Sequence, residues 1–336
     1  MAAQAVAAPP WCWSPGRAPA DVARAVSAWC GGPALARLAS PFDAAAAGAT
    51  TPEDRLARLE AVAARHWDLR GGRERHHLDA GPGHLDDLVL AAGAELGLLG
   101  ERPPLRDRYD WVLVLGGLLR ACLVRPRHLA LLHGQGLRAG QVVGLGAFRP
   151  LSGSELPMVA PFGLAVADEF GCLVEGMHRA LRPRGPGSTE RGADDDVRRR
   201  WRVDRWALAD RTPVAAVAAP SGDPLRRRAN TADGYAFWLE RFHPAAGETV
   251  LVITNPIYVP YQGAVAARLL GLGHGLAVET IGAGAAAGDL GGRTPGFSPR
   301  HYLQEIAASV TAMRALRDAA QQSGMVWSQS WAALSP

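Results

Sequence analysis

Residues that could bind or transform a small molecule stand in four short segments, each close behind an apolar stretch. Three of them could transfer protons: Glu155, Asp233 and Tyr258. The others would bind the substrate: Gly116, Gly117, Arg120, Gly146, Arg149, Arg228, Asn230, Thr231, Thr254, Asn255 and Tyr261. Glycine lets a ligand approach backbone N–H groups, and arginine binds phosphate or carboxylate through a planar fork. Together the four segments favour a site for a small anion.

Each residue type has a definite task in such a site. Glu155 or Asp233 would act as the general acid or base, with Tyr258 as an alternative proton donor. The side chains that would hold the negative charge are Arg120, Arg149 and Arg228, and those that would orient the ligand are Asn230, Thr231 and Asn255.

Taken singly, the same segments have structural explanations. Gly116-Gly117 is typical of a tight turn, and Asn230-Thr231 is typical of a helix cap. The run 226–228 is typical of a solvated basic patch. The joint placement of the segments is what favours a polar site.

Several common kinds of site are excluded. The chain has no lysine, so neither a Schiff-base lysine nor a phosphate-loop lysine exists here. The segment 144–146 lacks the third glycine of a dinucleotide fingerprint, and the nucleophile-elbow pattern G-x-S-x-G is absent. The grouping of His66, Asp68, His76, His77 and Asp79 has no metal-binding spacing, so no metal is predicted.

Three arginines in a glycine-containing segment, Arg70, Arg73 and Arg75, stand just before the predicted sheet domain. These arginines would either line a second wall of the predicted cleft or belong to an exposed linker. Both interpretations stay open.

The elements that must position the site alternate between strand and helix. Short apolar runs predict strands over 110–115, 141–146, 213–219, 249–254 and 276–281, separated by segments of helical spacing. Such alternation predicts right-handed crossovers and an α/β, Rossmann-like, doubly wound and mostly parallel five-stranded sheet. Ligands bind beyond the carboxyl ends of such strands, where the four segments begin.

The predicted organisation has three parts. Residues 1–108 form an N-terminal arm and a helical region, with helices over about 21–29, 52–67 and 85–98. Thr51 is the predicted N-cap of the helix over 52–67. Residues 109–282 form the α/β domain, in which 183–211 is a flexible insertion rich in Pro, Gly, Arg and Asp. Residues 283–336 hold a closing amphipathic helix and a tail.

With these motifs in place, residues 109–282 resemble the YdcF/SanA/ElyC-like family, a conserved domain of unknown function. Its strand ending in Gly-Gly matches 113–117, its glycine turn with a downstream glutamate matches 146–155, and its Asn-Thr helix start matches 230–233. In the last motif, over 254–262, Tyr258 and Tyr261 replace the family's His and Arg. The resemblance implies a Rossmann-like fold with a polar cleft. Unlike most members, this sequence lacks a membrane anchor and adds the helical region.

The amino-acid composition excludes some classes of protein. With 336 residues, 48% of them hydrophobic, and a net charge of +4, the chain is neither a disordered acidic tail nor a nucleic-acid-binding domain. Four scattered cysteines and no signal or membrane segment predict a soluble, cytoplasmic protein. We expect an enzyme of specialised metabolism that acts on a small anionic or nucleotide-like substrate. The alternatives are a non-catalytic small-ligand-binding or partner protein and an adenosyl-cofactor-dependent transferase.

Overall fold

The computed structural model describes residues 9–14, 17–43, 49, 51–69, 83–192, 194–290 and 296–332. The chain forms two compact units. A helical unit comprises Met1–Gly100, Ile257–Gly275 and Pro295–Pro336, and a sheet unit comprises Glu101–Pro256 and Leu276–Thr294. Arg70, Arg73, Arg75, His76, His77 and Asp79, singled out above, lie outside the described residues.

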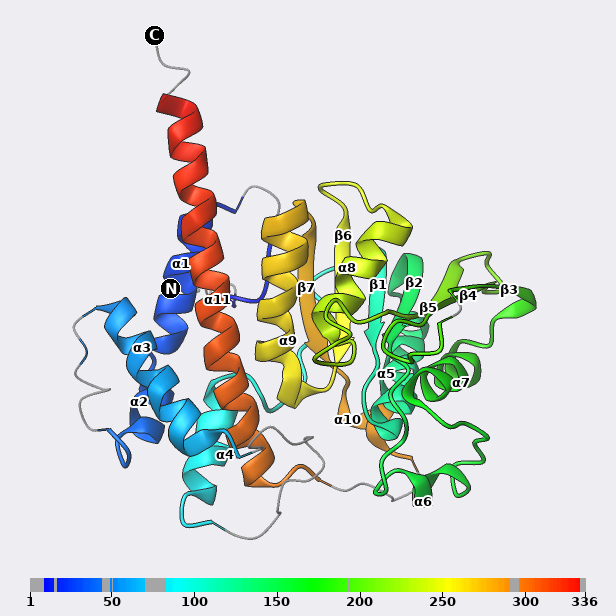
Figure 1. Cartoon of the computed structure of the whole chain (residues 1–336), viewed down its shortest axis with the longest axis horizontal. Coiled ribbons are helices and arrows are strands. Elements are labelled where there is room, and N and C mark those ends of the chain that lie inside the picture. The colour runs from blue at the N-terminus through cyan, green and yellow to red at the C-terminus, as the bar shows by residue number, and fades with distance from the viewer. Residues whose placement is uncertain are drawn as a thin grey trace. The chain divides into compact units, whose positions relative to one another are not determined.

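The helical unit is built around its long C-terminal helix. Its elements are α1 (Pro19–Cys30), α2 (Pro33–Ala39), α3 (Pro52–Val62), the π-helical turn η2 (Ala63–Trp67), α4 (Asp86–Glu95), η4 (Pro256–Tyr258, shared with the sheet unit at Pro256), α9 (Val259–Ala266), the π-helical segment η5 (Ala267–Leu272) and α11 (Pro299–Ala332). Helix α11 packs against α1, α4 and α9 (Figure 1). The predicted cap at Thr51 is confirmed at the start of α3, because the Thr51 hydroxyl accepts from the Asp54 N–H at 3.1 Å.

The N-terminal arm is part of the core of this unit. Trp11 and Trp13 are 4% and 9% exposed. Trp11 packs over Gly263 and Gly97, and Trp13 packs over Gly271. A β-carbon at Gly263 would stand 2.6 Å from that of Trp11, so only glycine leaves room for the indole.

The sheet unit follows the predicted alternation. Its elements are β1 (Arg108–Leu115), α5 (Leu119–Gly134), β2 (Arg138–Gly146), α6 (Leu156–Val159), α7 (Glu169–Leu181), β3 (Arg184–Gly192), β4 (Trp201–Ala207), β5 (Pro213–Ala218), α8 (Thr231–Phe242), β6 (Thr249–Thr254), β7 (Ala277–Gly282) and α10 (Ala285–Gly288). All five predicted strands are present and pair in parallel as β5-β2-β1-β6-β7. The α/β class is confirmed.

Helices cover both faces of this sheet. A β-carbon on Gly144 of β2 would meet Leu173 and Met177 of α7. The next residue of the strand, Leu145, faces Gly234 of α8. Since successive strand residues point to opposite faces, α7 and α8 lie on opposite sides of the sheet (Figure 1). Helix α5 packs beside α7.

The prediction of a five-stranded sheet is wrong in its strand number. In the described part of the chain the sheet has seven strands, because the segment predicted as a flexible insertion adds the antiparallel strands β3 and β4 next to β5. Indole rings stabilise this addition: Trp206 packs edge-on against His178, and Trp201 packs against Phe237. The segment is mostly polar, and only Trp201 and Val203 alternate with charged residues, so its strand signal is short.

Candidate functional site

The site lies at the carboxyl ends of the parallel strands. Strand β1 stands between β2 and β6, and the strand order reverses there: β2 and β5 lie on one side, and β6 and β7 on the other. Such a reversal places the loops that follow neighbouring strands at one edge, where α/β proteins bind ligands. The predicted site residues of the sheet unit lie at the last residues of β2 and β6, in the loops after β1, β2, β5 and β6, and in the first turns of α5 and α8.

Two predicted residues belong to the helical unit. The Tyr258 ring packs edge-on against Phe297, with 5.9 Å between ring centroids. Tyr261 is a half-buried residue of α9. The site of the sheet unit is therefore built without these two tyrosines.

Arg149 is the centre of the site and is 8% exposed. Its Nη1 and Nη2 donate to the two carboxylate oxygens of Glu155 at 2.7 and 2.9 Å, and its Nε donates to Glu169 Oε2 at 2.9 Å. Nη2 also donates to the Gly117 carbonyl at 2.9 Å, and Nη1 to the Pro150 carbonyl at 3.2 Å. A guanidinium has five N–H groups, so all of them are engaged within the protein. This geometry does not favour the predicted role of Arg149 as a direct ligand of the substrate.

Glu155 is a saturated, buried carboxylate. It is 1% exposed, and besides Arg149 it accepts from the Leu119 N–H at 2.7 Å and from the Ser152 N–H and hydroxyl at 2.9 and 2.7 Å. Burial acts to raise its pKa, but the bonds from Arg149, Ser152 and Leu119 outweigh burial and lower the pKa to about 2. Such a group stays ionised and has no lone pair left for a substrate proton. The geometry gives Glu155 a structural task in place of the predicted catalytic one.

Asp233, the second predicted acid or base, is also engaged. It belongs to a capping box in which the Asn230 side chain accepts from the Asp233 N–H, and Asp233 accepts from the Asn230 N–H at 2.8 Å. Arg227 donates to both of its oxygens, and the Gly222 N–H donates to Oδ1 at 3.0 Å. Burial opposes these bonds, yet together they lower the pKa of Asp233. The alternative interpretation of Asn230-Thr231 as a helix cap is confirmed.

Glu169, which the sequence pattern did not single out, has one carboxylate oxygen to which no described residue donates. It opens α7 directly after the cap Asp168, whose Oδ1 accepts from the Gly171 N–H at 2.8 Å. Arg149 holds Oε2, whereas no described residue donates a hydrogen bond to Oε1. Oε1 lies 2.5 Å from the position that a β-carbon on Gly116 would take. The sequence signal that could have identified Glu169 is its place directly after a helix cap that follows the second strand.

The surroundings of Glu169 favour a carboxyl that can take up a proton. Burial raises its pKa, and the positive charges of Arg149, Arg228 and Arg125 oppose that rise without cancelling it. A carboxyl with a raised pKa at the edge of an α/β sheet is a candidate acid or base.

Arg125 is a second functional candidate that the sequence analysis missed. It is 1% exposed within α5, and its Nη1 donates to the Leu115 and Gly116 carbonyls. Its Nε donates to Asn255 Oδ1 at 2.7 Å. A guanidinium only donates, so the amide must turn its oxygen toward Arg125 and its N–H groups away from it. An arginine inside a helix looks like a surface residue in the sequence, which is why no pattern singled it out.

The remaining predicted residues lie around this centre. Arg120 Nη2 donates to the Gly288 carbonyl. Thr254 is fully buried, and its carbonyl accepts from the Ala283 N–H at 2.6 Å. Arg228 is half-buried, and its charge acts on Glu169. A β-carbon on Gly146 would stand 3.2 Å from Leu173, so a side chain there would require Leu173 to shift.

Comparison with known proteins places the chain in a family. A family model described as the Rv3785 N-terminal domain matches residues 14–97. Over 332 residues the chain is 31% identical to uncharacterized protein Rv3785 of Mycobacterium tuberculosis, covering 88% of this chain and 90% of that protein. The chain belongs to the Rv3785 family. Uncharacterized protein Mb3814 of Mycobacterium bovis matches with the same identity and coverage, and no solved structure matches.

Two absences hold for the part of this Rv3785-family chain that the structure describes. Within it, no three His, Cys, Asp or Glu side chains gather so that they could hold a metal ion. Its helices also include none that is long and apolar enough to cross a membrane. The resemblance to the YdcF/SanA/ElyC-like family stays a prediction.

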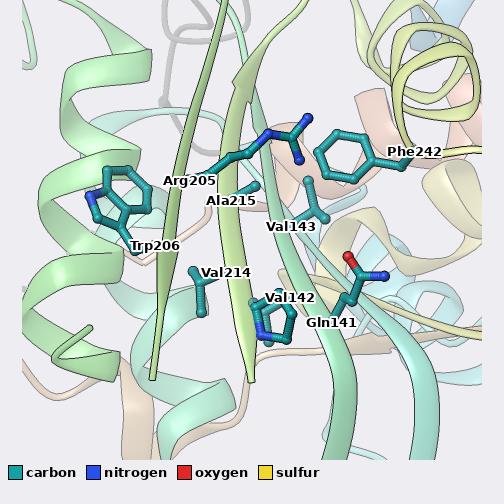
Figure 2. A pocket seen from close by; sticks show the side chains of 9 residues that line it. Gln141, Val142, Val143, Arg205, Trp206, Val214, Ala215 and Phe242 are labelled. Carbon is teal, nitrogen blue, oxygen red and sulfur yellow. The ribbon is translucent and has the colours of Figure 1, made fainter. Parts of the chain in front are cut away.

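A small cavity lies beside β2, β4 and β5 and is lined by none of the site residues (Figure 2). It is lined by Gln141, Val142, Val143, Arg205, Trp206, Pro213, Val214, Ala215 and Phe242. The Arg205 guanidinium lies over the Phe242 ring, 4.7 Å from its centroid. The volume of about 50 Å³ suits water, whereas small-molecule pockets reach hundreds of Å³. This cavity is too small for a drug-sized or nucleotide-like ligand.

Proposed function

We propose that the sheet unit is an enzyme domain that acts on a small anionic or nucleotide-like molecule at the carboxyl edge of its parallel strands. In this proposal Glu169 takes up and returns the proton. The observation that carries it is the state of this carboxylate: Arg149 holds one oxygen, while the other oxygen meets no described donor and lies against Gly116. Glu155 and Asp233 have no such free oxygen, so Glu169 replaces them as the acid or base.

Charge at this edge supports an anionic ligand. The positive charges of Arg149, Arg228 and Arg125 act on Glu169. These three guanidinium groups favour a negatively charged ligand at this edge. Asn255, oriented by Arg125, supplies an amide donor for an oxygen of the ligand.

The finer features of fold and location belong to the same proposal. The order β5-β2-β1-β6-β7 supports a Rossmann-like, doubly wound sheet with its ligand at the β1/β6 reversal. Four cysteines that form no disulfide support a cytoplasmic protein, because oxidising compartments favour disulfides.

One observation favours a second function, a non-catalytic ligand-binding protein. The two carboxylates first predicted to be catalytic, Glu155 and Asp233, are fully occupied in holding the backbone. A scaffold stabilised in this way would also suit a sensor or a partner subunit.

A ligand screen on the whole chain tests both functions. Thermal shift is measured with nucleotides, sugar phosphates and small carboxylates, and each binder is then incubated with protein and analysed by mass spectrometry. A ligand at a hundredfold excess over its Kd stabilises the protein by about 2.7 kcal/mol. Turnover by the native chain that Glu169→Gln abolishes supports the enzyme. Glu175→Gln is the matched control, because Glu175 lies on the same helix in a surface ion pair with Arg179.

The outcomes separate cleanly. If the native chain binds a ligand but does not convert it, the result supports the ligand-binding function and overturns the proposed enzymatic function. Turnover that persists in Glu169→Gln overturns the role of Glu169. A panel in which no anion shifts the melting temperature overturns the anionic site.

A further inference from the structure

Arg149 joins two carboxylates that have unequal surroundings. Its two Nη atoms bind Glu155, and its Nε binds Glu169. We propose that Arg149 and Glu155 are positioning residues, which hold Glu169 by one oxygen and present the other oxygen to the substrate. This inference rests on the proposed function and extends it to residues that do not touch the substrate.

The backbone contacts of the pair explain how the position is held. Glu155 binds the Leu119 N–H in the first turn of α5 and Ser152 in the loop after β2. Arg149 binds the Gly117 carbonyl in the loop after β1, and its own carbonyl accepts from the Glu169 N–H at 2.9 Å. The loops after β1 and β2 and the start of α7 are thus fixed to one buried ion pair.

A carboxylate held in this way has little freedom. Oε2 of Glu169 is fixed by Arg149, and Oε1 lies against the bare Cα of Gly116. The positions of both carboxylate oxygens are therefore fixed by residues from other elements. A defined direction is what a proton-transfer group needs, since geometric errors of about 1 Å reduce rates strongly.

Glu155 also sets the charge that Glu169 experiences. The charged and titratable groups around Glu169 are Cys122 and Arg125 of α5, Arg149 and Glu155 of the loop after β2, Asp168 and Cys172 at the start of α7, and Arg228 of the loop before α8. Burial raises the pKa of both thiols, so they stay neutral. Glu155 is the carboxylate that neutralises Arg149. Without its charge, Arg149 would act on Glu169 with its full positive charge.

The test titrates Glu169 directly in the full chain without ligand. The protein is labelled with carbon-13 at the glutamate carboxyls, and the Glu169 signal is identified by its loss in Glu169→Gln. In Glu155→Gln we expect the Glu169 titration midpoint to move to lower pH. In Glu155→Asp, which retains the charge, and in the control Glu175→Gln, it should stay near the native value. An unchanged midpoint in Glu155→Gln overturns the proposal.

A second variant covers the case in which Glu155→Gln does not fold. Arg149→Lys keeps the positive charge but loses the planar fork, so it cannot bind both carboxylates as Arg149 does. We expect the Glu169 midpoint to rise, because Oε2 loses its fixed donor. A midpoint equal to that of the native chain contradicts the positioning role. Since the titration needs no ligand, it can fail while the ligand screen succeeds, and the reverse.

Discussion

Oε1 of Glu169 lies 2.5 Å from the place where a β-carbon on Gly116 would stand. The same place is 3.0 Å from the Leu145 carbonyl oxygen and 3.1 Å from the Cα of Gly146. The end of β1 thus approaches both a carboxylate and the backbone of β2, and only glycine permits this approach.

Gly116→Ala should destabilise the protein and displace Glu169. The carboxylate can rotate away from the new methyl group, but the β2 backbone cannot, so we expect a loss of about 1–3 kcal/mol in the free energy of unfolding. Urea denaturation measures it. Gly153→Ala is the control, because nothing lies within 4 Å of a β-carbon there. Equal stability of the two variants would contradict the close approach.

Asn230→Ala should remove a helix cap. The Asn230 side chain accepts from the Ala232 and Asp233 N–H groups at 2.9 and 3.2 Å, so its loss should cost about 1 kcal/mol of stability. Thr231→Ala, one residue further on, should cost less. Urea denaturation compares the two variants. If Asn230 also orients a ligand, ligand affinity in Asn230→Ala should fall by more than the stability does.

Arg228→Ala should leave folding intact and weaken ligand binding. We expect stability within about 0.5 kcal/mol of the native value and an affinity loss of about 1.5–3 kcal/mol, typical of a hydrogen bond to a charged group. Calorimetry with a ligand from the screen measures the affinity. Arg226→Ala is the control, because the Arg226 side chain is 87% exposed. Unchanged affinity in Arg228→Ala would show that Arg228 does not bind the ligand.

Stability should fall in acid because of Glu155. Its pKa is about 2 in the folded chain against an ordinary value of 4.5, so the unfolded chain binds the proton more readily. The stabilisation is complete above about pH 4.5, amounts to about 3 kcal/mol, and is lost as the pH falls toward 2. The raised pKa of Glu169 acts in the opposite direction, since its contribution declines as the pH rises.

Urea denaturation of the native chain and of Glu155→Gln at several pH values between 6 and 2.5 measures this effect. The variant should be less stable at pH 6 and should lose less stability on acidification. Parallel pH curves for the two proteins would refute the assignment to Glu155.

Trp11→Ala should destabilise the helical unit. Trp11 is 4% exposed and fills the space above Gly263 and Gly97, so its truncation should cost about 3–5 kcal/mol. Thermal denaturation checks the loss. Ser14→Ala is the control, because Ser14 is exposed in the same arm. A loss equal to that of the control would mean that the arm does not belong to the core.

Local patterns determined the parallel part of the sheet and the places where its loops begin. Apolar runs of about six residues between helical segments marked all five parallel strands, since burial on both faces demands apolar side chains throughout. Cap residues such as Thr51 and Asn230 marked helix starts, because a cap acts on backbone N–H groups two or three residues away.

Only the tertiary structure decided which polar residues are free to act. Strands β3 and β4 form because β5 offers an unpaired edge and α7 and α8 offer partners for two indoles, none of which is local in sequence. Glu155 and Glu169 look equivalent along the chain. They differ because Leu119, 36 residues before Glu155, donates to Glu155, while no described donor reaches Oε1 of Glu169. Hydrogen-bond saturation depends on neighbours in space, and a sequence does not state them.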